Sequence, residues 1–285
     1  MSKKIAIISC SNANLEYFEH HYDIKIFRSM LHLGDEDYLD YTDIKAEDFY
    51  KRLEEDKSIF PSTSFMPIGQ MIEIYEGLVE EGYTDALVIS ISKEMSGIFN
   101  AALMAANEVE ELDVKVFDSK SLAFPQAKMV LTAAKMVEEG KSVAEITEEL
   151  YYIRDHNKIY FAVNTLTYLV KNGRLSNASG FIGNALKLKP VLTIDDGKVT
   201  TVEKIRTFRK AVEHILDLYF KETTGLDVEP FIIHANNPDT RDYIISRLKE
   251  NDSTLKDVFS MPLTAVVGAH AGPKTIGIGY YIKKK

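Results

Sequence analysis

Segments with the character of strands and helices alternate along the first half of the chain, and this pattern constrains the fold more than any other feature. Short apolar runs at 5–9, 85–92 and 114–119 are typical of buried strands. Residues 97–112 and 121–140 carry apolar side chains at helical spacing. Strands that alternate with helices pair in parallel, because each helix returns the chain to the start of the next strand. The pattern therefore predicts an α/β domain with a mainly parallel sheet.

Further helices are predicted on either side of this region. Residues 46–55 have helical spacing, and a second helix begins after Pro67 and ends at Gly82. Its apolar face consists of Ile68, Met71, Ile72, Tyr75, Leu78 and Val79. Ser142 and Glu145 have the spacing of a capping box, which predicts the start of another helix.

The pattern changes after about residue 157. Two β-branched runs within 189–205 flank Asp196-Gly197, which is typical of an antiparallel hairpin. Further strands are predicted at 229–235, 262–267 and 276–282, with helices at 209–220 and 239–249. We therefore expect two α/β domains: residues 1–157 with a mainly parallel sheet, and residues 158–285 with a mixed sheet.

Composition limits the compartment and the partners. The chain has one cysteine, Cys10, so no intrachain disulfide can form and a reducing, cytoplasmic setting is expected. The apolar run near the N-terminus is too short for a signal peptide or a membrane span. A net charge of −9 argues against nucleic acid as the main partner, because binding to phosphates needs clustered Lys and Arg.

The charge is nevertheless uneven. Residues 158–210 contain ten Lys and Arg but only three Asp and Glu, which gives a local charge of +7. Two interpretations are open: a solvated basic surface without a partner, or a surface that meets an acidic partner, including transient contact with a membrane surface.

Several catalytic and cofactor motifs are absent from the sequence. It contains no G-x-G-x-x-G or Walker loop for a nucleotide, no H-E-x-x-H and no Cys/His cluster for a metal. It also lacks the G-x-S-x-G of a nucleophile elbow. We therefore expect no metal and no nucleotide cofactor.

Two polar segments lie at predicted helix starts. Three hydroxyl side chains, Ser62, Thr63 and Ser64, stand just before the helix that follows Pro67. Ser96-Gly97 lies beyond a predicted strand, where α/β proteins commonly bind ligands, although Ser96 also suits a helix N-cap. If the two helix starts converge, their N–H groups and the hydroxyls would form a site for an anion.

A third polar segment lies near the C-terminus. His270 is flanked by glycines and precedes Pro273, which predicts a loop that carries the imidazole at the surface of a cleft. The alternative is a solvated histidine with no functional role.

These segments resemble the DegV family of bacterial fatty-acid-binding proteins. The likeness runs from about Ile5 to the C-terminus. The matching segments, in order, are PSTSFMP, ISKEMSGIFNAA, VFDSKS, YLVKNGRLS, LKPVLTIDDGKV, IRTFRKA and GAHAGPKTIGIGY.

The resemblance implies two α/β domains with a lipid tunnel at and behind their interface. It also implies a function as the binding subunit of a fatty acid kinase, with no catalysis of its own and with a long-chain fatty acid as the only ligand. A separate ATP-dependent catalytic subunit would phosphorylate the presented carboxylate for phospholipid synthesis.

The same resemblance assigns residues. Thr63, Ser96 and His270 would contact the carboxylate, together with Ser64 and Gly97. Arg174 in NGRLS would serve at the entrance or in work with the kinase.

This sequence departs from the family pattern at several polar positions. An Asp-Ser pair is replaced by Cys10-Ser11, and Thr-Ser-Gln-Pro by the run from Thr63 to Met66. Other replacements introduce Ile98, Ala269 and Ala271, and Phe124-Pro125-Gln126 stands where a glycine-containing turn is usual. Most of these changes make the surroundings of the expected head-group site less polar.

Two alternatives to the carrier hypothesis are open. The protein could be a lipid sensor or transporter without a kinase partner. It could also be a serine hydrolase that uses Ser96 with His270 as base, although the sequence shows no evident acidic residue to orient His270.

Overall fold

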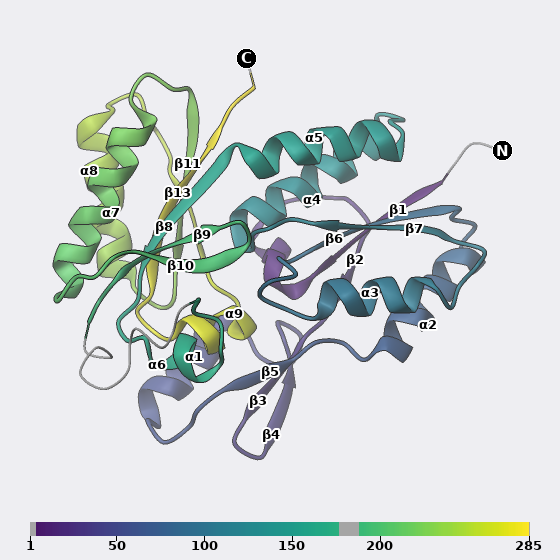
Figure 1. The fold of residues 1–285 in the computed structure, drawn as a ribbon, viewed down its shortest axis with the longest axis horizontal. Helices are drawn as coiled ribbons and strands as arrows, with labels where there is room; N and C mark the ends of the chain where they lie inside the picture. Colours follow the sequence, from purple (N-terminus) through teal and green to yellow (C-terminus); the bar gives the residue numbers. More distant parts are fainter. Residues whose placement is uncertain (1–3, 177–187, 285) are drawn as a thin grey trace. The chain divides into compact units, whose positions relative to one another are not determined.

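The computed structural model describes residues 4–176 and 188–284 (Figure 1). Contacts divide the chain into two compact units. The first contains the residues up to Leu31 together with Thr63–Asp155, and the second contains His32–Ser62 together with the residues from His156 onward. The units differ from the predicted domains 1–157 and 158–285 in the segment 32–62, which groups with the C-terminal part of the chain.

The first unit is built on a parallel sheet, which confirms the prediction. Its strands are β1 (Ile5–Cys10), β2 (Ile24–Phe27), β6 (Asp85–Ser90) and β7 (Asp113–Asp118). They lie in the order β2-β1-β6-β7, and every neighbouring pair is parallel. β1 and β6 are buried throughout, as expected for central strands covered on both faces. Two short 3₁₀ turns, Ser11–Ala13 and Leu15–Tyr17, follow β1.

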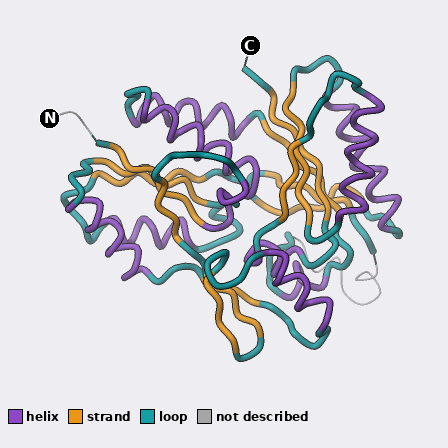
Figure 2. Tube along the Cα trace, turned by 180° about the vertical axis from the view of Figure 1, so that it is seen from behind, coloured by secondary structure: helices purple, strands orange, loops and turns teal. Residues whose placement is uncertain are grey.

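Helices cover both faces of this sheet. They are α2 (Ile68–Glu80), α3 (Ile98–Ala106), α4 (Ala123–Glu138) and α5 (Val143–Asp155). The pair α2 and α3 packs on one face and the pair α4 and α5 on the other; Figure 2 shows the same layering from behind.

Local hydrogen bonds and charges explain where α5 begins and where α3 ends. The predicted capping box is present, because the Ser142 N–H donates to Glu145 Oε2 (2.9 Å) and the Glu145 N–H donates to Ser142 Oγ (3.3 Å). α3 is shorter than the predicted 97–112, since it ends at Ala106. Glu108, Glu110 and Glu111 follow, and carboxylates are unfavourable at the negative end of a helix dipole.

The segment 32–62 contains elements that the sequence pattern did not predict. A three-stranded sheet has the order β4-β3-β5 and consists of β3 (Met30–Leu33), β4 (Glu36–Leu39) and β5 (Ser62–Ser64). α1 spans Ala46–Glu55, as predicted. The chain passes from one unit to the other within β3 and within β5.

The second unit contains a mixed sheet, again as predicted. Its strands are β8 (Asn157–Ala162), β9 (Val191–Asp195), β10 (Lys198–Glu203), β11 (Val228–His234), β12 (Phe259–Pro262) and β13 (Ile276–Ile282). They lie in the order β10-β9-β8-β13-β11-β12. The β11–β12 pair is parallel and the other pairs are antiparallel. Asp196 and Gly197 have φ values of 43° and 79°, which is the left-handed backbone that a two-residue hairpin turn requires.

Two long helices pack against this sheet. They are α7 (Phe208–Thr223) and α8 (Pro238–Asn251). Ala211 and Ile215 of α7 share a buried core with Ile232 of β11, Ile244 of α8 and Ile278 of β13.

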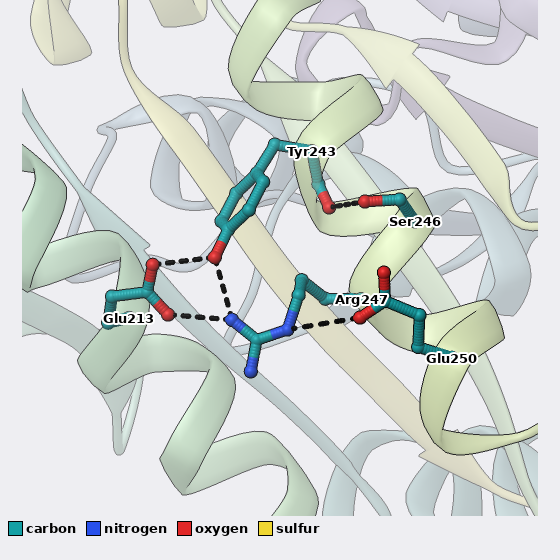
Figure 3. A network of polar contacts seen from close by, with 5 residues as sticks. All are labelled: Glu213, Tyr243, Ser246, Arg247 and Glu250. Atoms are coloured by element: carbon teal, nitrogen blue, oxygen red, sulfur yellow. Dashed lines mark hydrogen bonds and ion pairs between the residues drawn. The ribbon is translucent and has the colours of Figure 1, made fainter.

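A polar network joins α8 to α7 (Figure 3). Glu213 of α7 accepts hydrogen bonds from Tyr243 Oη (2.6 Å) and Arg247 Nη1 (2.8 Å) of α8. The hydrogen bond from Tyr243 and, to a smaller extent, the interaction with Arg247 lower the pKa of Glu213 below its ordinary value. The network holds the exposed side of α8 to α7. It adds to the packing of the two fully buried side chains of α8, Ile244 and Leu248.

The predicted strand at 262–267 and the predicted loop around His270 are wrong. β12 ends at Pro262, and Ala265–Ala271 form helix α9, which contains His270. Gly272, with φ 80°, ends this helix. A short buried apolar run does not by itself distinguish a strand from a helix, and here the packing of α9 against α1 and α6 (Thr167–Lys171) selects the helix.

Candidate functional site

The first part of the candidate site lies at the carboxyl ends of β1 and β6. In the order β2-β1-β6-β7, the chain passes from β1 to β2 toward one edge of the sheet and from β6 to β7 toward the other edge. Such a reversal of strand order leaves a crevice beyond the strand ends, where α/β proteins bind ligands. The loop from Ile91 to Gly97 leads from β6 into α3 at this edge.

The segment that precedes α2 contacts the start of α3 within the first unit. The ring of Phe65, which follows Ser64, packs against Gly97 at the start of α3. A Cβ atom built on Gly97 would lie 2.9 Å from Phe65 Cε1, so only glycine allows the ring to lie there. α2 and α3 then pack side by side. The residue that follows the hydroxyl segment therefore contacts the start of α3.

The polar side chains of this region differ in exposure. Thr63 is partly buried on β5, and Ser64 is exposed. Ser96 is partly buried, and its Oγ accepts a hydrogen bond from the Ile98 N–H (3.3 Å). Gly97 is the N-cap of α3, so the first N–H groups of that helix point toward this segment.

A buried polar cluster lies behind the strand ends. Gln126 of α4 is fully buried, and its Nε2 donates to Cys10 Sγ (3.2 Å) and to the Ile89 carbonyl (3.1 Å). Burial raises the pKa of the Cys10 thiol. Because the reactive form of cysteine is the thiolate, Cys10 is a packing residue and not a nucleophile at neutral pH.

The second part of the candidate site lies in the second unit. Asn172 Nδ2 donates to the carbonyl of Ala269 in α9 (3.0 Å), which joins the loop after α6 to the helix of His270. Burial, and then the nearby Arg174 guanidinium, lower the pKa of His270 from 6.5 to about 4. The imidazole is therefore neutral near pH 7, so it can donate a hydrogen bond without adding charge.

Aromatic packing fixes the surroundings of His270. The ring of Tyr168 lies against Gly272, where a Cβ atom would be 2.4 Å from Tyr168 Cδ2. Phe60 stacks on Tyr168 with ring centroids 5.4 Å apart, and Lys171 Nζ lies 4.6 Å from the Phe60 centroid. Phe60 thereby connects the segment before Ser62 to the helix of His270.

The structure groups the predicted site residues by unit. Thr63, Ser64, Ser96 and Gly97 belong to the first unit. Arg174 and His270 belong to the second and are close enough to interact. The contact residues Phe65, Tyr168 and Asn172 were not among the predicted site residues. No sequence motif marks an aromatic ring that packs on a glycine, as Phe65 and Tyr168 do, or an amide that bonds a distant carbonyl, as Asn172 does.

The described ranges 4–176 and 188–284 contain neither a cluster of metal-ligating side chains nor a helix that could span a membrane. No three His, Cys, Asp or Glu side chains there are grouped so as to hold a metal ion. Within the same residues, no helix combines the length and the apolar character that a membrane span requires.

Comparisons with known proteins identify the family. Residues 4–283 match the family model described as "Uncharacterised protein, DegV family". The chain is 33% identical to the DegV domain-containing protein SA0704 of Staphylococcus aureus, over 99% of this chain and 98% of the relative. It is 32% identical to the DegV domain-containing protein BH3627 of Halalkalibacterium halodurans, over 88% of each chain.

Solved structures have the same fold. The fatty acid binding DegV family protein SAG1342 of Streptococcus agalactiae superimposes with a TM-score of 0.89 at 27% identity, over 99% of this chain and 100% of that one. DegV of Bacillus subtilis, described as a fatty acid binding protein, superimposes with a TM-score of 0.85 at 30% identity and the same coverage. On the strength of both the sequence and the structural matches, the chain belongs to the DegV family.

Proposed function

We propose that this protein binds a long-chain fatty acid and presents its carboxylate to a separate ATP-dependent fatty acid kinase, without catalysing the reaction itself. Thr63, Ser64, Ser96, Gly97 and His270 would hold the carboxylate. Arg174 would act at the entrance or in contact with the kinase. The acyl chain would lie in an apolar tunnel.

The contact between Phe65 and the start of α3 is the observation that supports this proposal most directly. The Phe65 ring contacts Gly97, and Phe65 directly follows the hydroxyl segment. Hydroxyl groups and helix N–H groups are both neutral donors suited to a carboxylate. The fatty-acid-binding relatives named above supply the class of ligand.

The acyl chain and the carboxylate of the ligand would contribute to binding in different ways. Burial of the methylenes of a sixteen-carbon chain is worth roughly 12 kcal/mol, at about 0.8 kcal/mol each, before the costs of association. A carboxylate buried without partners would carry a heavy penalty, so hydrogen-bond donors are needed to offset it. The chain would thus provide the affinity, and the donors would orient the head group for phosphorylation.

The proposed site needs no general base. A carboxylate is already a nucleophile, and attack on the γ-phosphate of ATP would give an acyl phosphate and ADP on the kinase. The proposal places the protein in the cytoplasm, because the partner consumes ATP and because the only cysteine is a thiol that a reducing compartment preserves.

Native mass spectrometry of the purified protein tests the binding. The expected result is a co-purified long-chain fatty acid, which Ser96→Ala retains with reduced affinity because one donor is lost. Ser246→Ala is the matched control, since this exposed serine donates a hydrogen bond to the Tyr243 carbonyl of its own helix (2.8 Å). Absence of any acyl ligand, before and after incubation with palmitate, would contradict the proposal.

A second measurement tests the kinase partnership. Palmitate is used at a saturating concentration, because Arg174 lies close to His270. Arg174→Glu should then impair phosphorylation of bound fatty acid by a cognate kinase. Lys221→Glu, an exposed charge reversal on α7, should affect neither palmitate binding nor phosphorylation. If Arg174→Glu is phosphorylated at the wild-type rate, the assigned role of Arg174 is wrong. If the wild-type protein binds palmitate but no kinase phosphorylates it, the protein is a lipid carrier or sensor without such a partner.

A further inference from the structure

Phe65 is an apolar side chain in an otherwise polar part of the candidate site. It directly follows the three hydroxyl residues, yet its ring is 40% exposed. An exposed aromatic ring loses the benefit of burial, so its presence beside hydrogen-bond donors calls for a reason other than the stability of the core.

Two features of the first unit orient this ring toward the donors. Its edge packs against Gly97, beside Ser96 and the first N–H groups of α3. In addition, Phe65 directly follows β5 (Ser62–Ser64), so the ring is attached next to the hydroxyl segment, in which Thr63 is partly buried. The Phe65 ring therefore lies beside the hydroxyl segment, which it follows in the chain, and beside Ser96-Gly97, whose glycine it contacts.

The combination fits one arrangement of an acidic ligand. A carboxylate that meets the donors of Thr63 and Ser96 would place the atoms next to it, beginning with its α-carbon, against the exposed face of Phe65. A methylene in that place gains contact with the ring. A hydroxyl there would lose hydration and find no partner on an aromatic face.

We propose that Phe65 is a specificity-determining residue that selects carboxylic acids with an unsubstituted α-carbon and disfavours 2-hydroxy acids. This inference rests on the proposed function, because it assumes that a carboxylate binds beside Thr63 and Ser96. It extends that function by naming a class of acyl ligands that the protein discriminates against.

Competition binding tests the inference. The full-length protein, freed of lipid, is loaded with cis-parinaric acid as a fluorescent probe, which is then displaced by palmitic acid or by 2-hydroxypalmitic acid. The wild-type protein should prefer palmitic acid by about tenfold, which is the order expected when an apolar surface must accept an added hydroxyl.

Variants separate the role of the ring from a general loss of structure. Phe65→Gln should reduce the preference to about twofold or less, because an amide can bond the hydroxyl. Phe65→Leu, which stays apolar, should retain most of the preference. Met104→Gln is the matched control: Met104 is an apolar side chain, 57% exposed, on α3 of the same unit, and its loss should leave the ratio unchanged.

The outcomes distinguish this inference from the proposed function. If neither the probe nor palmitic acid binds the wild-type protein, the proposed function fails. If palmitic acid binds but Phe65→Gln keeps the wild-type ratio while remaining folded by circular dichroism, the role of Phe65 is refuted. A change in ratio for Phe65→Gln, absent in Met104→Gln, supports it.

Discussion

Replacement of His270 by Gln should make the stability of the lipid-free protein less sensitive to acid. Burial and the Arg174 guanidinium lower the pKa of His270 from 6.5 to about 4. Between these values the unfolded chain binds a proton at His270 that the folded protein does not bind. The stability that depends on a neutral His270 is therefore fully present above the unfolded pKa of 6.5, and it is lost as the pH falls toward the folded pKa of about 4.

The magnitude follows from the same pKa values. A fall from 6.5 to about 4 corresponds to about 3 kcal/mol of unfolding free energy, since one pKa unit is worth about 1.4 kcal/mol. At about pH 5 the unfolded histidine is mostly protonated and the folded one mostly neutral, so roughly 2 kcal/mol of that amount is already lost. Between about pH 7.5 and pH 5, the wild-type protein should therefore lose roughly 2 kcal/mol more stability than His270→Gln.

Urea unfolding followed by far-ultraviolet circular dichroism measures this difference, because the chain has no tryptophan for fluorescence. Both proteins keep the other titratable groups, so the pH dependence that they share cancels in the comparison. His20→Gln, which removes an exposed imidazole, should follow the wild type. If His270→Gln and the wild-type protein lose equal stability over this range, His270 is not held neutral in the folded state.

Two further substitutions test the fold. Gly279→Ala on β13 should destabilise the protein by about 3 kcal/mol or more, because the added Cβ would lie 2.5 Å from the backbone carbonyl oxygen of Lys158. Gly77→Ala, where nothing lies within 4 Å, should be neutral or stabilising in the same urea assay. Equal effects of the two substitutions would contradict the packing of β13. In Ser142→Ala the Ser142 N–H bond, the largest cause of the low pKa of Glu145, remains, but the bond from Ser142 Oγ is lost, so the pKa should rise above about 2 and stay below its ordinary value. A carboxyl ¹³C titration that shows no change would contradict the capping box.

Elements with a strong local signal were predictable from the sequence. α1 and β13 have the predicted bounds, and the Asp196-Gly197 turn forms the predicted hairpin. In each case the periodicity or the turn residues alone specify the structure. α9 was not predictable, because its short apolar sequence suits a buried strand equally well and its conformation depends on distant residues. The hydroxyl of Tyr50, for instance, lies where a Cβ of Gly268 would be and donates to the Leu263 carbonyl (3.0 Å).

The candidate site shows the same division. The sequence indicated that the 62–64 hydroxyls and Ser96-Gly97 each precede a helix, but it left open whether the two segments meet, because β5 belongs to the three-stranded sheet and not to the parallel sheet. The part played by Phe65 was not predictable, because the sequence shows only that an aromatic residue replaces a polar one. Its contact with Gly97 depends on two segments more than thirty residues apart in the chain.

The passage of the chain between the units has a consequence for experiments on fragments. The first unit is interrupted by residues 32–62, which belong to the second. A single truncation near residue 155 would therefore yield a polypeptide that still carries residues 32–62, including α1, but lacks the rest of the second unit, against which these residues pack. An isolated first unit would instead require a gene in which a short linker joins Leu31 directly to Thr63.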